Sequence, residues 1–166
     1  LKDLPLENWN LMVNIGLTGT FLMSQAAGRW MIDNGRPGSI VTLSSVGGHQ
    51  PYGMSGAYST VKATLIMLSK HLAIEWAGSG IRVNAVAPGY VGTGWFSERM
   101  TPDAFEKFEA FIAGQTQMQL AAHAEDIAGP IVNLLDPASR VITGEIVLLD
   151  AGAHLDVGLS RRPGKG

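Results

Sequence analysis

The chain of 166 residues has no cysteine, no marked excess of charge of either sign and few aromatic residues. Without cysteine it has neither a disulfide framework nor thiolate metal sites, which fits a reducing cytoplasm. The net charge is only −2, so nothing favours nucleic acid as a partner. No uninterrupted apolar run approaches a membrane-spanning length, and the start lacks the basic and apolar regions of a signal peptide. We therefore expect a cytoplasmic protein that contacts neither nucleic acid nor membrane.

What is present is an alternation of helical and strand-like segments that fits one domain. We predict long helices over residues 5–34 and 57–78, and shorter ones in PDAFEKFEAFIA and HAEDIAGPIVNLLDP. Short strands are predicted in SIVTLSS, IRVNAVAPG and GEIVLLDAG. Each strand is a continuous apolar run, which is typical of a parallel sheet covered on both faces. The sequence thus predicts an α/β fold with a doubly wound parallel sheet, thin at three strands.

Glycines punctuate this pattern. Gly16 and Gly19, inside the first long helix, predict close packing or a local kink. Residues 47–56, GGHQPYGMSG, predict a glycine-rich loop. Gly78 or Gly80 is expected to end the second long helix.

Two polar side chains stand four residues apart in the segment GAYSTVKAT. In a helix, Tyr58 and Lys62 would share a face. A free phenol has a pKa of about 10, and a nearby ammonium favours the phenolate, so Tyr58 could exchange a proton with an alcohol or carbonyl oxygen. Such a pair is also a common coincidence, in which Tyr58 is a helix-face aromatic and Lys62 a solvated neighbour.

Further polar groups follow the predicted strands. Reactive groups in open α/β sheets gather at the carboxyl ends of strands, and here the first strand ends at Ser45 and the second at Pro88-Gly89. If these strands are neighbours, Ser45, Tyr58 and the Pro-Gly turn converge on one crevice, with Asn14 added from the first helix. Ser45 could donate a hydrogen bond to the oxygen that exchanges its proton. The matching hydride would need a nicotinamide cofactor, since side chains cannot carry one.

Five motifs occur together in one order: VNIGLTGTF, GSIVTLSSVGG, AYSTVK, IRVNAVAPG and GEIVLLDAG. By these motifs the chain resembles the C-terminal portion of a short-chain dehydrogenase/reductase, over nearly its whole length to about Gly152. The resemblance implies that residues 1–152 form the C-terminal part of a Rossmann-like oxidoreductase domain and residues 153–166 a tail. The family's TGxxxGxG-type phosphate-binding motif and NNAG-type strand end do not occur. Since the chain also begins with Leu1 rather than Met, we expect the first half of the nucleotide-binding sheet to be missing.

The resemblance implies a role for each matching residue. Tyr58 would be the general acid/base, and Lys62 would lower its pKa and hold the nicotinamide ribose. Ser45 would orient the substrate oxygen, and Asn14 would support the proton relay through water. A plainer alternative is that Ser45 bonds the backbone at the strand end, and another is that Asn14 satisfies a helix kink near Gly16.

The cofactor and substrate regions follow from the same resemblance. The segment that borders the nicotinamide in the family is matched by Pro88, Gly89, Val91 and Thr93. Thr93 could also be an ordinary loop or cap residue. The stretch from about 94 to 119 falls where the family keeps its substrate-covering loop, in which Trp95 and Phe96 could line a pocket.

Together these features predict an NAD- or NADP-dependent oxidoreductase that interconverts a small-molecule alcohol and a carbonyl by hydride transfer. One alternative is a catalytically silent fragment or pseudoenzyme that acts as an oligomerisation or interaction module. Another is an extended-type relative such as a sugar-nucleotide epimerase, against which the NAVAPG turn and the short end after Asp150 argue.

The two long helices exceed what one thin sheet needs as cover. In the family the matching helices pair between subunits, which implies a homodimer or homotetramer; the alternative is that they cover the missing half of the sheet. His71, His123 and His154 lack partners at metal-ligand spacing, so no metal site is expected.

Overall fold

A computed structural model of the chain describes residues 1–51, 53 and 55–155. Of the predicted tail over residues 153–166, residues 153–155 form a helical turn, and the rest lies outside the described residues. The centre of the described structure is a three-stranded parallel sheet in the order β1-β2-β3, formed by β1 (Gly38–Leu43), β2 (Ile81–Pro88) and β3 (Ile146–Leu149). The predicted α/β class and the parallel sheet are confirmed.

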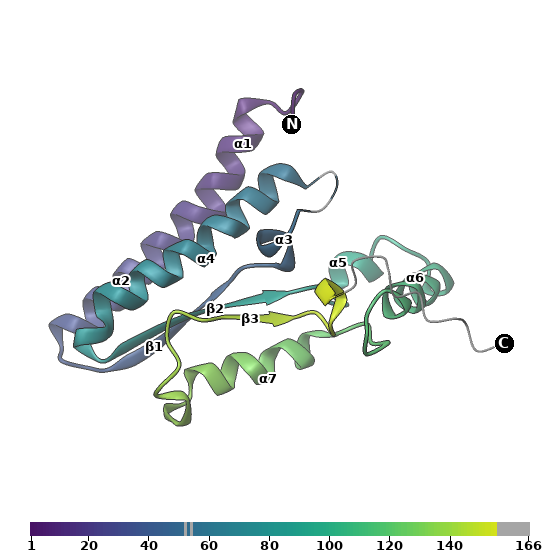
Figure 1. The fold of residues 1–166 in the computed structure, drawn as a ribbon. Coiled ribbons are helices and arrows are strands. Elements are labelled where there is room, and N and C mark those ends of the chain that lie inside the picture. The colour runs from purple at the N-terminus through teal and green to yellow at the C-terminus, as the bar shows by residue number, and fades with distance from the viewer. Residues whose placement is uncertain (52, 54, 156–166) are drawn as a thin grey trace.

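Helices cover both faces of this sheet (Figure 1). On one face lie α1 (Leu6–Met12), η1 (Val13–Thr18), α2 (Gly19–Asp33) and α4 (Gly56–Trp76). The other face is covered by α7 (Ala124–Leu135), which contacts β1 and β2. The short helical turns are α3 (Val46–His49), η2 (Ala77–Ser79), α5 (Gly94–Ser97), η3 (Pro137–Ser139) and η4 (Ala153–Leu155).

The core lies where α4 packs on β2. Leu65, Ile81, Val83 and Val86 are almost fully buried, and each such side chain stabilises the fold by roughly 1.5–3 kcal/mol. Asn84 is buried among them, and its Nδ2 donates to the carbonyl of Ile142 while its Oδ1 accepts from the N–H of Glu145. This buried amide therefore fixes the connection that leads into β3.

The predicted helix over residues 5–34 is one continuous helical run from Leu6 to Asp33, but its middle segment, η1, is a π-helix. The N–H of Gly19 donates to the carbonyl of Asn14, five residues earlier. At Gly16 an added Cβ would lie 2.5 Å from Cγ1 of Val61, so only glycine allows this close approach to α4. The expected close packing at Gly16 is thereby confirmed.

The second long helix ends as the glycine pattern predicts. After α4 and η2, Gly80 adopts the left-handed conformation with φ +73°, which glycine adopts without strain. The prediction of an irregular loop over residues 47–56 is wrong at its start, because α3 forms there. Its first turn is capped by the side chain of Ser45, a local signal that the glycine content hides.

The segment after β2 leads to α5 and α6 (Pro102–Gly114), beyond the carboxyl end of that strand (Figure 1). The predicted helix over residues 102–113 is confirmed. Its N-terminus is capped by Thr101, whose Oγ1 accepts from the N–H of Ala104. Within the described ranges, no helix is both long enough and apolar enough to cross a bilayer.

Candidate active site

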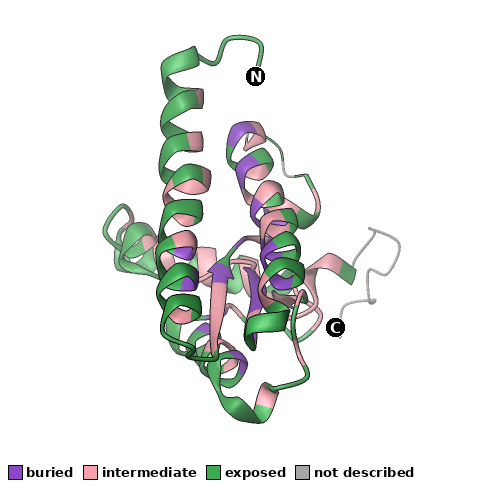
Figure 2. Ribbon diagram, turned by 90° about the vertical axis from the view of Figure 1, so that its left-hand side faces the viewer, coloured by how far each residue is buried: buried purple, intermediate pink, exposed green. Residues whose placement is uncertain are grey.

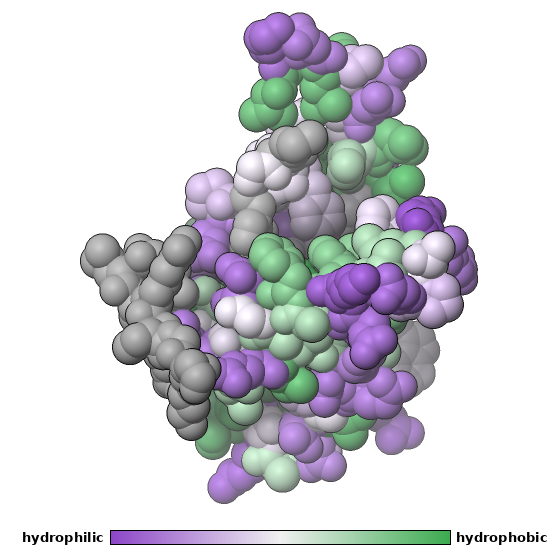
Figure 3. All heavy atoms as spheres, turned by 90° about the vertical axis from the view of Figure 1, so that its right-hand side faces the viewer, coloured by the Kyte–Doolittle hydropathy of each residue, from purple (hydrophilic) through white to green (hydrophobic). Residues whose placement is uncertain are grey.

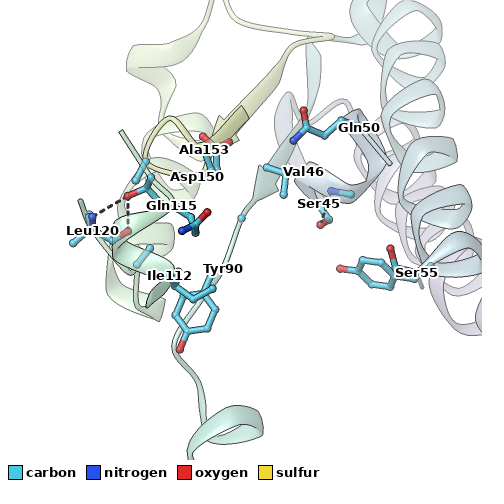
Figure 4. A pocket seen from close by; sticks show the side chains of 16 residues that line it. Ser45, Val46, Gln50, Ser55, Tyr90, Ile112, Gln115, Leu120, Asp150 and Ala153 are labelled. Carbon is cyan, nitrogen blue, oxygen red and sulfur yellow. Dashed lines mark hydrogen bonds between the residues drawn. The ribbon is translucent and has the colours of Figure 1, made fainter. Parts of the chain in front are cut away.

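A cavity of about 680 Å³ opens where the three strands end (Figure 4). This volume is typical of sites for small molecules. Its walls come from α3, the start of α4, the segments after β2 and β3, and the end of α6. The lining residues are Ser45, Val46, Gly47, Gln50, Ser55, Tyr58, Gly89, Tyr90, Ile112, Gln115, Thr116, Leu120, Ala122, Asp150, Ala151 and Ala153.

One wall carries two hydroxyl groups, from Ser45 and Tyr58. Ser45 caps α3, and its Oγ accepts a hydrogen bond of 3.1 Å from the N–H of Gly47. Because that bond uses the oxygen as acceptor, the hydroxyl hydrogen can still be donated to a molecule in the cavity. Tyr58 lies in the first turn of α4 and is 39% exposed, so a ligand can reach its phenol.

Lys62 lies beside Tyr58, as the four-residue spacing predicts. Its Nζ is 5.6 Å from the centroid of the Tyr58 ring and donates a 2.7 Å hydrogen bond to the carbonyl of Leu43. Burial lowers the pKa of Lys62 below its ordinary value. The ammonium is thus held between the end of β1 and the phenol.

Two contacts fix α4 at the level of Lys62. The Oγ of Ser44 donates to the carbonyl of Lys62 at 2.8 Å. At Gly48, an added Cβ would lie 2.6 Å from the carbonyl carbon of Lys62, so α3 and α4 meet there backbone to backbone. The geometry of Ser45, Tyr58 and Lys62 therefore depends on the packing of α3 against α4.

A buried carboxylate closes the cavity at the end of β3. The side chain of Asp150 is 2% exposed and accepts hydrogen bonds from the N–H groups of Gly152 and His154. The ring Nδ1 of His154 lies 2.8 Å from its Oδ2. An added Cβ at Gly89 would lie 2.8 Å from Cβ of Asp150, so glycine is needed where β2 ends.

The α6 wall is mostly apolar, with Ile112 and Leu120, but it also carries an amide. Figure 4 shows the side chain of Gln115 directed into the cavity, with Ser45 on the far side. The neighbouring Thr116 hydroxyl donates to the carbonyl of Leu120 and accepts from its N–H. At this end of the molecule an apolar surface patch is bordered by polar residues (Figure 3).

Tyr90 joins α6 to the end of β2. Its hydroxyl donates to Oε1 of Glu109 at 3.2 Å, and burial, that hydrogen bond and the Glu109 charge together raise the pKa of Tyr90 to about 12. The same Oε1 is 3.5 Å from Nε2 of His123. Tyr90 also packs against Phe96 and Phe108. These contacts hold α6 over the cavity.

The structure brings together part of the predicted constellation. Ser45, Tyr58 and Gly89 line one cavity, and Lys62 lies beside Tyr58. Ser45 also bonds the backbone, as the plainer alternative proposed, so in this case the two interpretations are compatible.

The remaining predicted residues lie apart from the cavity lining. Pro88 ends β2, and Val91 is not among the lining residues. Thr93 is the N-cap residue of α5, and its carbonyl accepts from the N–H groups of residues 96 and 97, which matches its cap alternative. Asn14 is exposed at the π-helical segment, where its backbone carbonyl accepts from the N–H of Gly19; that bond does not involve its side chain, so both interpretations of Asn14 stay predictions.

Other lining residues were not predicted. Asp150 follows the third strand, so the strand-end rule that found Ser45 and Gly89 could have found it. Gln115 has no such signal, because it reaches the cavity from the C-cap position that follows α6. Trp95 and Phe96 contact each other edge to face and are not among the lining residues. Among the residues that the structure describes, no three His, Asp or Glu side chains gather as metal ligands.

Known proteins resemble this chain in sequence and in fold. A family model described as enoyl-(acyl carrier protein) reductase matches residues 1–154. Dehydrogenase/reductase SDR family member 4 of Bos taurus is 33% identical over 153 residues, covering 92% of this chain and 53% of the relative. The chain belongs to the short-chain dehydrogenase/reductase family.

Bacterial relatives and solved structures agree. The chain is 35% identical over 156 residues to 2-dehydro-3-deoxy-D-gluconate 5-dehydrogenase of Bacillus subtilis, covering 91% of this chain and 58% of the relative. A solved structure of ElxO with NADP bound has a TM-score of 0.85 and 30% identity, covering 94% of this chain and 62% of that one. This chain thus spans little more than half the length of the curated relatives that it matches.

Proposed function

We propose that the protein is an NAD- or NADP-dependent oxidoreductase that interconverts a small-molecule alcohol and a carbonyl. The observation that carries this proposal is the joint presence of Ser45 and Tyr58 on one cavity, with the ammonium of Lys62 5.6 Å from the Tyr58 ring. A phenol, a cation and a hydrogen-bond donor are the groups that proton exchange at a substrate oxygen requires. Family membership supports the same reaction class.

The residues of the chain act on the substrate oxygen. Ser45 donates a hydrogen bond that positions this oxygen, and Tyr58 gives it a proton or takes one from it. The positive charge of Lys62 stabilises the negative charge that develops on the phenol when the proton leaves. Asp150 and Gly89 shape the floor of the cavity. A role for Asn14 in relaying the proton stays a prediction.

A nicotinamide cofactor fits these residues. The cavity is large enough for a nicotinamide beside a small substrate, and Gly89 is one of its lining residues. Gly89 and Tyr58 would border the ring, with Pro88, Val91 and Thr93 in the adjoining segment and Lys62 towards the ribose. When bound, the cofactor supplies the hydride acceptor or donor. Relatives solved with NADP and with NAD⁺ support either nucleotide.

The segment from 94 to 119 is proposed to cover the substrate, since Ile112 and Gln115 line the cavity. A cytoplasmic homo-oligomer is proposed as the working form. Support comes from the largely exposed run of α1 to α2 (Figure 2), whose apolar side chains include Leu11, Ile15 and Met23.

The proposal is tested with the natural full-length protein that contains this sequence. Reduction of NAD⁺ or NADP⁺ in the presence of secondary alcohols should be measurable, and Lys62→Met should lower kcat/KM roughly a hundredfold or more. Lys70→Met, an exposed lysine on the same helix, is the matched control and should behave as the unmodified protein. Failure to bind either nucleotide would contradict the proposal and favour the silent interaction module.

A further inference from the structure

The described lining of the cavity carries no positive charge. No Lys or Arg occurs among its residues, and it includes the carboxylate of Asp150. That carboxylate already accepts hydrogen bonds from two backbone N–H groups and lies against the His154 ring. Lys62 lies beside Tyr58 but is not among the lining residues, and its ammonium already donates to the carbonyl of Leu43. A carboxylate or phosphate group bound at the α6 wall would therefore leave water with no Lys or Arg of the described lining to balance its charge, and with the carboxylate of Asp150 in the same lining. The lining therefore disfavours an anionic substrate.

The α6 wall offers hydrogen bonding of a particular kind. Gln115 points into the cavity (Figure 4), and its amide can both donate and accept hydrogen bonds. A hydroxyl group also donates and accepts, whereas a carboxylate only accepts. The flanking Ile112 and Leu120 are apolar, and the Thr116 hydroxyl is engaged with the backbone of Leu120. Gln115 is thus well suited to bind a hydroxyl group.

The position of Gln115 sets where that hydroxyl lies on the substrate. Ser45 is on the opposite side of the cavity (Figure 4), and the reacting oxygen belongs beside Ser45 and Tyr58. We infer that the site takes a neutral substrate with several hydroxyl groups, a polyol or sugar, and that Gln115 binds a hydroxyl remote from the reacting carbon. This inference rests on the proposed function and narrows its substrate class.

The test compares three groups of substrates on the natural full-length protein. Neutral hexitols and hexoses are paired with sugar acids of the same number of carbons, and simple secondary alcohols form the third group. Formation of the reduced nicotinamide gives kcat/KM for each. We expect kcat/KM for the neutral member of each pair to exceed that for the acid by about tenfold or more, because the lining offers no cation to pair with the carboxylate.

Three variants test whether Gln115 determines the preference for polyols over sugar acids. Gln115→Leu should lower kcat/KM for the polyols by about tenfold and leave simple alcohols unchanged, because they lack the remote hydroxyl. Gln115→Arg supplies the missing cation and should raise the use of sugar acids relative to polyols by about tenfold. Asn133→Leu removes a side-chain amide from an exposed position of α7, outside the cavity lining, and should leave these ratios unchanged.

Each contrary result has a distinct meaning. Sugar acids used as well as polyols, or an equal effect of Gln115→Leu on all three groups, would overturn the inference. Turnover of simple alcohols alone would also overturn it, while leaving the proposed oxidoreductase function intact. Absence of nucleotide binding and of all turnover would instead contradict the proposed function, and the inference with it.

Discussion

At the scale of single residues, Tyr90 makes a prediction about pH. Its pKa in the folded protein is raised to about 12, mainly by burial and then by Glu109, whereas an unfolded tyrosine has a pKa of about 10. The folded state therefore holds the phenol proton more tightly. The resulting stabilisation is fully present below about pH 10 and is lost as the pH rises towards 12. The free energy of unfolding, measured with denaturant at several pH values across this range, should fall less steeply for Tyr90→Phe than for the unmodified protein.

The part played by Glu109 can be measured separately. Glu109→Gln removes its charge, so the titration of Tyr90 should move to lower pH. Absorbance of the tyrosinate during an alkaline titration reports this shift. Glu106→Gln removes a charge from an exposed position of the same helix and should leave the curve unchanged. An identical curve for both variants would show that Glu109 does not hold Tyr90 in solution.

Which site residues the sequence predicts depends on how each reaches the cavity. Ser45 and Gly89 follow strands, and the ends of parallel strands meet at one edge of the sheet, so their proximity follows from local pattern. Tyr58 and Lys62 share a helix face by spacing alone. Gln115 directly follows α6, whose placement depends on long-range contacts such as that between Tyr90 and Glu109, and no local pattern encodes it.

At the scale of elements, the contact of α3 with α4 makes a second prediction. Gly48→Ala would place a methyl group against the backbone at Lys62. We expect a loss of about 1–3 kcal/mol in the free energy of unfolding, measured with denaturant. A lower kcat should accompany it, because Ser45 and Lys62 lie on the two elements that would be pushed apart.

A control variant separates this packing effect from a general cost of alanine. Gly129 lies inside α7, and an added Cβ there has open space. Gly129→Ala should therefore leave stability unchanged or raise it by roughly 0.5–1 kcal/mol, since alanine favours helix. If Gly48→Ala is equally harmless, α3 does not position the site in the way described.

An element boundary was predictable where a glycine marks it, as at Gly80. The π-helical segment over Val13–Thr18 was not. The glycine at 16 predicts the close approach to Val61 of α4, but no residue pattern in the segment distinguishes π-type from α-type hydrogen bonds. The short helix α3 was missed for the opposite reason, since its glycines suggest a loop while its packing against α4 makes it helical.

At the scale of the whole molecule, the exposed apolar residues of the first helical run predict self-association. Ile15 is 69% and Met23 73% exposed, and covering such side chains favours a partner surface. Ile15→Glu combined with Met23→Glu should shift the full-length protein towards monomer in sedimentation experiments. Val141→Glu, at a position 83% exposed outside these helices, is the control. An unchanged assembly in the double variant would mean that these helices do not form the interface.

The central claim is that Tyr58 exchanges a proton with the substrate oxygen. The most direct test compares Tyr58→Phe with the unmodified full-length protein in both nucleotide binding and turnover. We predict that the variant binds NAD(P)H with nearly unchanged affinity and loses turnover by roughly a hundredfold or more, because only the phenolic oxygen is removed. Substantial residual turnover with intact nucleotide binding would contradict the claim.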